Sequence, residues 1–100
     1  MNEHYVYVLC SQKDNEWYIG QTDRHPEERL REHNAGQMVS TKLRRPLELI
    51  YYEMYRHKQD ALGREKFLKS GAGHNFVRKQ LRNFLNHHRG VEQPGSSQGS

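Results

Sequence analysis

The feature that most constrains the fold is a continuous apolar segment near the start of the chain, residues 5–10, with the sequence Tyr-Val-Tyr-Val-Leu-Cys. β-Branched and aromatic side chains occupy both its odd and its even positions, so a strand formed here would be apolar on both faces. We therefore predict a strand that is buried on both faces. The segment is far shorter than the roughly 20 apolar residues that cross a bilayer, and we expect no membrane partner.

The size of the chain limits it to one thin hydrophobic core. It has 100 residues, of which 33% are hydrophobic, so we expect a single domain whose core is supported by aromatic side chains. Cys10 is the only cysteine, which excludes a disulfide framework and a cysteine-rich zinc site. The first residues include Glu3 and His4 and do not form the pattern of a signal peptide. We expect a cytoplasmic protein.

Two further strands and three helices are predicted from the rest of the chain. The polar segment 11–16 separates the first strand from a second at residues 17–20, which predicts a hairpin. The later elements are a strand over Leu47–Tyr55 and helices over residues 26–35, 59–70 and 75–87, with Gly36 and Gly71-Ala72-Gly73 as helix stops. The order ββαβαα predicts an α+β domain with one small sheet over residues 1–88, followed by a disordered tail over residues 89–100.

Positive charge is concentrated in the second half of the chain. Residues 1–37 contain four Lys or Arg against seven acidic residues, whereas residues 38–90 contain twelve against four. The second half is therefore a candidate to bind a polyanion through its phosphate groups. A solvated basic surface is the alternative, and charge alone does not distinguish nucleic acid from an anionic membrane.

One acidic side chain interrupts an apolar stripe. On the predicted helix 59–70, Glu65 lies between Ala61, Leu62 and Leu68 at helical spacing. An ionised carboxylate in that position is costly unless it is paired or binds a cation. A salt bridge to an Arg or Lys of a neighbouring element is one explanation. The other is a ligand for a hard divalent ion, and a single carboxylate suits Mg²⁺.

Two residue pairs could join that carboxylate in a site. Arg29 and His33 are four residues apart and therefore lie on one helical face, where they could bind a phosphate or, alternatively, pair with nearby glutamates. Tyr7 and Tyr18 lie at comparable depths in consecutive strands, so a hairpin can bring both hydroxyls to one face. Packing of tyrosine in the core is the alternative for the second pair.

Taken together, these residues resemble the GIY-YIG nuclease superfamily, in particular its small single-domain members related to the nuclease domain of the excision-repair protein UvrC. The half-motifs are Tyr5-Val6-Tyr7, in which the leading glycine of the family is absent, and Tyr18-Ile19-Gly20. The resemblance covers residues 5–85 and implies a three-stranded antiparallel sheet flanked by helices. It continues through residues 28–34, 40–46, 48–53 and 61–71.

The resemblance implies a divalent-metal-dependent endonuclease that hydrolyses phosphodiester bonds in DNA, with a role in DNA repair. Glu65 would hold one Mg²⁺ or Mn²⁺, Arg29 would stabilise charge on the phosphate, and a tyrosine or His33 would take the proton of the attacking water. Cationic neighbours would have to lower the pKa of a tyrosine that acts as the base, and Arg29, His33 and the metal would supply them. The implied catalytic residues are Tyr7, Tyr18, Arg29, His33 and Glu65, and the expected substrate-binding residues are Lys42, Arg44, Arg45, Lys66, Lys69 and Asn75.

Two other functions stay open at this point. A non-catalytic nucleic-acid-binding module of the same fold would keep the basic surface, although the complete set of implied catalytic residues favours an enzyme. A module that recruits a repair or recombination protein is the third class, and a protein partner is compatible with any of them. The sequence does not decide between DNA and RNA, the preferred DNA structure, the oligomeric state or the pathway.

Overall fold

The central strand of the sheet is the segment that the sequence predicts to be buried on both faces. In the computed structural model, which describes residues 2–88, β1 (His4–Ser11) lies between β2 (Trp17–Thr22) and β3 (Leu47–Tyr55). Both pairings are antiparallel, and all residues of β1 after the first are buried. The prediction of an α+β fold with a three-stranded antiparallel sheet is confirmed. The two outer strands, β2 and β3, are the edges of the sheet.

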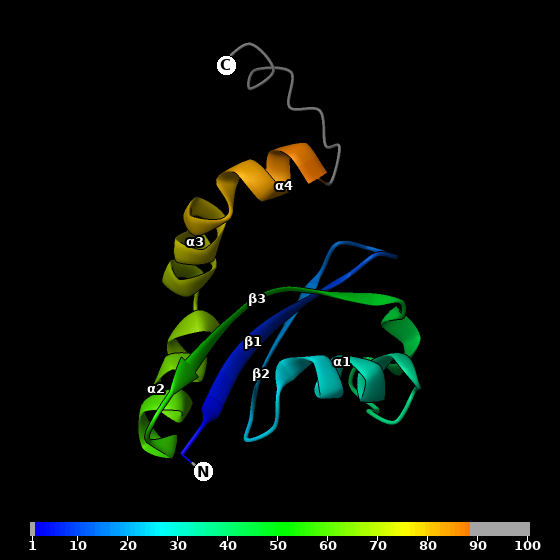
Figure 1. Cartoon of the computed structure of the whole chain (residues 1–100). Helices are drawn as coiled ribbons and strands as arrows, with labels where there is room; N and C mark the ends of the chain where they lie inside the picture. Colours follow the sequence, from blue (N-terminus) through cyan, green and yellow to red (C-terminus); the bar gives the residue numbers. More distant parts are fainter. Residues whose placement is uncertain (1, 89–100) are drawn as a thin grey trace.

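Helices cover the two faces of the sheet from opposite sides, as Figure 1 shows for α1 (Pro26–Asn34) and α2 (Lys58–Leu68). Alternate side chains of β1 enter one hydrophobic core or the other, so Tyr7 lies on the α1 side. The core on the α2 side contains Val6, Val8, Ile19, Ala61, Leu68 and Val77, and the core on the α1 side contains Tyr7, Leu9 and Leu47 with partly buried Tyr18, Leu30 and Leu49.

The first two helices begin with the same capping device. His25 precedes α1, and its Nδ1 accepts a hydrogen bond from the backbone N–H of Glu27 at 3.1 Å. His57 caps α2 in the same way through the N–H of Gln59, also at 3.1 Å. Pro26 occupies the first turn of α1, where its missing N–H costs nothing. These caps fix where each helix starts and therefore which side chains face the sheet.

The predicted last helix is wrong in its bounds and in its continuity. The chain forms α3 (Gly71–Gln80) and then α4 (Arg82–His88), with the break at Leu81. The glycines predicted as a helix stop form the first turn of α3, because the hydroxyl of Ser70 accepts the N–H of Gly73 at 3.1 Å and caps the new helix. A side chain at Gly73 would collide with the backbone of α2, so glycine permits this close junction. The expected basic loop before β3 also contains one 3₁₀ turn, Lys42–Arg44.

Within residues 2–88, no helix is both long enough and apolar enough to cross a membrane. The tail expected from residue 89 onward lies outside the described residues.

Candidate active site

Tyr7 is the centre of the polar cluster on the α1 side of the sheet. Only 1% of it is exposed, and it pairs with Gly20 across the β1–β2 ladder. A Cβ atom at residue 20 would lie 2.5 Å from the Tyr7 hydroxyl oxygen and 2.6 Å from its Cζ. The phenol therefore lies directly across the backbone of Gly20. Glycine at the end of Tyr18-Ile19-Gly20 is thus required by the position of the Tyr7 ring.

Tyr18 shares the face of Tyr7, as the hairpin prediction requires. It lies two residues before Gly20 on β2 and pairs with Leu9, so its side chain leaves the sheet on the α1 side. The centroids of the Tyr7 and Tyr18 rings are 6.4 Å apart, and the Tyr18 ring is 5.0 Å from the ring of His33. Tyr18 is only half-buried. It can therefore contact a bound molecule, whereas Tyr7 is almost fully buried.

His33 connects the sheet to the loop that follows α1. The imidazole is fully buried, and its Nε2 lies 3.2 Å from the Tyr7 hydroxyl. Its Nδ1 lies 2.7 Å from the hydroxyl oxygen of Thr41, which is also fully buried. Burial lowers the pKa of His33, and the nearby Arg29 guanidinium lowers it further. The imidazole is therefore neutral at neutral pH.

Arg29 lies one turn before His33 on α1. Its Nη1 donates to Glu32 at 2.7 Å, and its Nη2 lies 3.9 Å from the sulfur of Met38. Glu32 also binds Arg24 at 2.8 Å, so two guanidinium groups share one carboxylate. The Nε of Arg29 is buried and has no hydrogen-bond partner within residues 2–88. Arg29 thus retains its positive charge, which acts on the Tyr7 hydroxyl.

The hydroxyl of Tyr7 stays protonated in this environment. Burial raises the pKa of Tyr7, the Arg29 guanidinium opposes that shift without cancelling it, and Tyr18 and Glu65 add to the increase. The idea that His33 would lower the pKa of a tyrosine as a cation is not supported, because His33 is neutral. A Tyr7 phenolate therefore forms only if the proton has an acceptor at hand.

Glu65 belongs to α2, the helix on the other face of the sheet, yet its charge acts on Tyr7. Glu65 is therefore close enough to Tyr7 for its charge to raise the pKa of the phenol. The carboxylate is partly buried and forms an ion pair with Lys69 at 3.2 Å, one turn later on the same helix. Lys69 itself is exposed, so this pair contributes only about 0.3–0.5 kcal/mol.

The donor set around Glu65 suits a hard cation that keeps most of its water ligands. Within residues 2–88, no group of three His, Cys, Asp or Glu side chains is placed to bind a metal ion. This excludes a closed zinc-type cage over that range. A single carboxylate fits Mg²⁺ or Mn²⁺, which would take further ligands from water and from a substrate phosphate.

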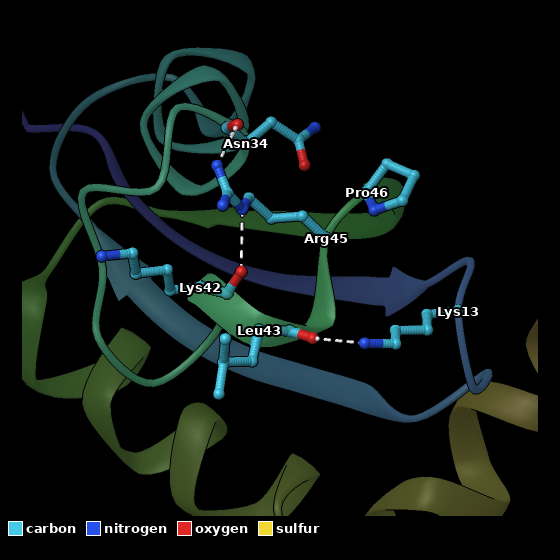
Figure 2. A pocket seen from close by; sticks show the side chains of 6 residues that line it. All are labelled: Lys13, Asn34, Lys42, Leu43, Arg45 and Pro46. Atoms are coloured by element: carbon cyan, nitrogen blue, oxygen red, sulfur yellow. Dashed lines mark hydrogen bonds between the residues drawn. The ribbon is translucent and has the colours of Figure 1, made fainter.

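The predicted basic loop divides into structural and exposed residues (Figure 2). Arg45 donates from Nε to the carbonyl of Lys42 at 2.8 Å and from Nη1 to the carbonyl of Asn34 at 3.4 Å. It lies against Gly36, whose φ of +82° ends α1, so Arg45 closes the C-terminal end of that helix.

Arg44 is half-buried, with its Nε 4.0 Å from Asp14. Lys42 is exposed beside a pocket lined by Lys13, Asn34, Leu43 and Pro46.

The other predicted substrate contacts lie on α2 and α3. Lys66 on α2 and Lys69, the C-cap residue of that helix, are both exposed and follow Glu65 in the chain. Asn75 is exposed on α3, and its side-chain oxygen accepts a hydrogen bond from Arg78 at 3.2 Å. That contact directs Asn75 toward its own helix, so it does not join Tyr7 and its neighbours.

Sequence reasoning missed Thr41 as a member of the cluster. It stands in the basic loop before β3, eight residues after His33, where no periodicity indicates which side chains are buried. A small polar residue between exposed basic ones gives no signal of its own. Only the return of the loop to α1 places its hydroxyl against the imidazole.

Comparisons with known proteins identify the family. The GIY-YIG catalytic domain matches residues 3–76. UPF0213 protein SH2523 of Staphylococcus haemolyticus is 44% identical over 71 residues, which cover 70% of this chain and 84% of that protein. UPF0213 protein YazA of Bacillus subtilis is 43% identical over 70 residues, 68% of each chain. The solution structure of UPF0213 protein BH0048 from Bacillus halodurans is 28% identical with a TM-score of 0.48, over 78% of this chain and 84% of that one. The chain therefore belongs to the GIY-YIG catalytic domain family, a nuclease-type family that acts on nucleic acids, and to its small UPF0213 members.

Proposed function

We propose that the protein is a divalent-metal-dependent endonuclease that hydrolyses phosphodiester bonds in DNA. The observation that carries the proposal is the buried pair of Tyr7 and neutral His33, with the guanidinium of Arg29 beside it. A proton donor, a proton acceptor and a cation on one face are what hydrolysis of a phosphodiester requires. Membership of a nuclease-type family supports the same conclusion.

Arg29 is the phosphate-binding residue in this proposal. Its buried Nε–H has no partner within the described residues, and Glu32 fixes the guanidinium from the other side. A fork of N–H donors matches the oxygens of a phosphate and stabilises the negative charge that grows on them during attack. Because the guanidinium is already oriented, little reorganisation is needed when the charge develops.

Tyr7 and His33 move the proton of the attacking water. As the water oxygen forms its bond to phosphorus, one water proton passes to the Tyr7 oxygen and the Tyr7 hydroxyl proton passes to Nε2 of His33. The bond from phosphorus to the 3′-oxygen breaks, and that oxygen takes a proton from solvent. The raised pKa of Tyr7 and the lowered pKa of His33 keep both groups in the required starting states, a phenol and a neutral imidazole.

Glu65 is the residue that would hold the metal. A bound Mg²⁺ or Mn²⁺ would neutralise charge on a phosphate oxygen and on the leaving 3′-oxygen. Lys69 forms an ion pair with the carboxylate and is exposed, so its side chain can move away when a cation binds. Tyr18, half-buried on the edge strand β2, would contact the substrate beside the cleaved bond.

Substrate binding would rest on exposed lysines, with Lys42, Lys66 and Lys69 as the proposed phosphate contacts. Such contacts give affinity that depends on salt and carry no sequence information. Selection by DNA structure or by a protein partner is therefore expected. Arg45 and Asn75 become weaker candidates because each side chain is hydrogen-bonded within the chain. Arg44 stays a candidate, because its Nε is 4.0 Å from Asp14 and its Nη2 has no partner within residues 2–88.

Incubation of the purified protein with supercoiled plasmid, single-stranded DNA and RNA tests the proposal. We expect cleavage of DNA with Mg²⁺ or Mn²⁺ and none with EDTA. Binding without cleavage in either metal would identify a non-catalytic module instead, and cleavage of RNA alone would overturn the DNA assignment.

Glu65→Gln separates catalysis from binding in the same assay. Loss of the metal-binding charge should reduce cleavage by orders of magnitude, since even one transition-state hydrogen-bond donor is worth about 2.7–4 kcal/mol. DNA affinity in EDTA should stay near that of the wild type or rise slightly. Glu27→Gln, at an exposed position of α1, makes the same charge change away from the site and should cleave normally. Full activity of Glu65→Gln would remove Glu65 from the metal site.

A further inference from the structure

The loop between α1 and β3 carries a buried side chain, Thr41, that lies outside the proposed path of the proton. Thr41 is 0% exposed although its neighbours Ser40 and Lys42 are exposed. Its hydroxyl oxygen lies 2.7 Å from Nδ1 of His33, a shorter contact than the 3.2 Å between Nε2 and the Tyr7 hydroxyl. Both ring nitrogens of a fully buried histidine are thus occupied, one by each hydroxyl.

The backbone around Thr41 is held in place on both sides. The N–H of Thr41 donates to the carbonyl of Met38 at 3.2 Å, and the carbonyl of Thr41 accepts the N–H of Arg44 at 2.9 Å. The Met38 sulfur is in turn 3.9 Å from Nη2 of Arg29. The loop therefore contacts both Arg29 and His33 of α1, and two backbone hydrogen bonds fix the main chain at Thr41.

The direction of the hydrogen bonds follows from the groups around Tyr7. A neutral imidazole carries one N–H and one lone pair, so His33 can accept from only one of its two hydroxyl partners. The Arg29 guanidinium, whose charge acts on the Tyr7 hydroxyl, can only donate hydrogen bonds, so the phenol O–H needs its acceptor elsewhere. The phenol O–H then points to Nε2, its hydrogen-bond partner. The imidazole hydrogen is left on Nδ1, where Thr41 accepts it.

We infer that Thr41 is a positioning residue that accepts the Nδ1–H of His33 and so keeps the Nε2 lone pair aimed at the Tyr7 hydroxyl. The kinetic part of this inference rests on the proposed function, whereas the choice of tautomer does not. Proton transfer from Tyr7 needs that lone pair, and after transfer the Nδ1–H remains bound to Thr41. The other tautomer would place a hydrogen on Nε2 and leave the Tyr7 proton with no acceptor on His33.

The substitutions Thr41→Val and Thr41→Ser test the role of the hydroxyl. Valine keeps the shape and removes the hydroxyl, whereas serine keeps the hydroxyl and removes a methyl group. Nitrogen-15 NMR of the imidazole reports the tautomer directly, and His33→Gln identifies its signals among those of the seven histidines. We expect Nδ1–H in the wild type and in Thr41→Ser, and loss of that single tautomer in Thr41→Val. An unchanged Nδ1–H tautomer in Thr41→Val, or Nε2–H in the wild type, would overturn the inference.

Cleavage kinetics provide the second measurement. Thr41→Val should lower kcat by about 10- to 100-fold with little change in KM, as loss of a group that orients a histidine does elsewhere. Thr41→Ser should retain most of the wild-type kcat. Thr22→Val is the matched control, because Thr22 is also buried and its hydroxyl oxygen accepts a backbone N–H, from Arg24. Equal losses of kcat in Thr22→Val and Thr41→Val would reduce Thr41 to a structural role. If the wild type cleaves no nucleic acid, the proposed function fails while the NMR result still decides the tautomer.

Discussion

Gly20→Ala is the substitution whose effect follows most directly from the geometry. The new Cβ would lie 2.6 Å from Cζ of Tyr7, whereas carbon atoms pack comfortably at about 3.5–4.0 Å, so the ring must move by about 1 Å. Tyr7 is 1% exposed and packs in a core cluster with Leu9 and Leu47. Overpacking of this kind costs about 1–3 kcal/mol. The same movement would stretch the 3.2 Å contact between Tyr7 and His33 beyond hydrogen-bonding distance.

Thermal unfolding of Gly20→Ala measures this cost. For a domain of this size, 1–3 kcal/mol corresponds to a fall in Tm of roughly 4–8 °C per kcal/mol. Gly63→Ala is the control, because a Cβ at that position on α2 meets no atom within 4 Å. That variant should gain about 0.5–1 kcal/mol, since alanine is the better helix former. A Gly20→Ala protein as stable as the wild type, with full cleavage activity, would refute the placement of Tyr7 across Gly20.

Two further predictions concern the basic loop and the buried histidine. Lys42→Ala should weaken DNA binding and flatten the slope of log affinity against log salt concentration by up to about one unit. Arg45→Ala should lower Tm and leave that slope nearly unchanged, because Arg45 holds the loop to the end of α1. Fluorescence anisotropy over a salt series separates the two variants, and the reverse pattern would show that Arg45, not Lys42, is the phosphate contact. His33 has a folded-state pKa below its ordinary value of 6.5, so as pH falls through that value the unfolded state binds a proton that the folded state does not. The free energy of unfolding should therefore decrease as the pH is lowered below about 6.5, and less steeply in His33→Gln. Urea denaturation between pH 7 and 5 measures this free energy for both proteins. If it falls equally steeply with pH in the wild type and in His33→Gln, the pKa of His33 is not depressed.

The sequence predicts the fold well where local patterns determine it. Residues 5–10 are apolar on both faces because β1 is the central strand, and the bounds of β3 match the prediction exactly at Leu47 and Tyr55. The division between α3 and α4 was not predictable from hydrophobic spacing, since apolar residues continue through Leu81. The start of α3 depends on Ser70, a capping residue whose role shows only when the helix pair packs together.

The grouping of Tyr7, Tyr18 and His33 was predictable from the sequence, whereas the place of Thr41 beside them and the proton states were not. The spacing of Arg29 and His33 placed both on one helical face, and the hairpin placed Tyr7 and Tyr18 together. The neutrality of His33 depends on burial that tertiary packing creates, which a single sequence does not reveal. The structural role of Arg45 likewise depends on the return of the loop to the end of α1.

The role of the Tyr7 hydroxyl in DNA cleavage is measured by the cleavage rate of Tyr7→Phe. The substitution removes the single hydroxyl through which the proton is proposed to pass and leaves the ring packed across Gly20. Tyr52→Phe, on β3 and partly exposed, removes a hydroxyl on the same face and serves as the control. With Mg²⁺ and single-turnover conditions, we expect a fall of about 10²- to 10⁴-fold for Tyr7→Phe at unchanged DNA affinity, and no fall for Tyr52→Phe. A Tyr7→Phe rate within about twofold of the wild type would show that the hydroxyl carries no proton in catalysis, because general acid–base catalysis by a positioned group is worth about 10²-fold or more.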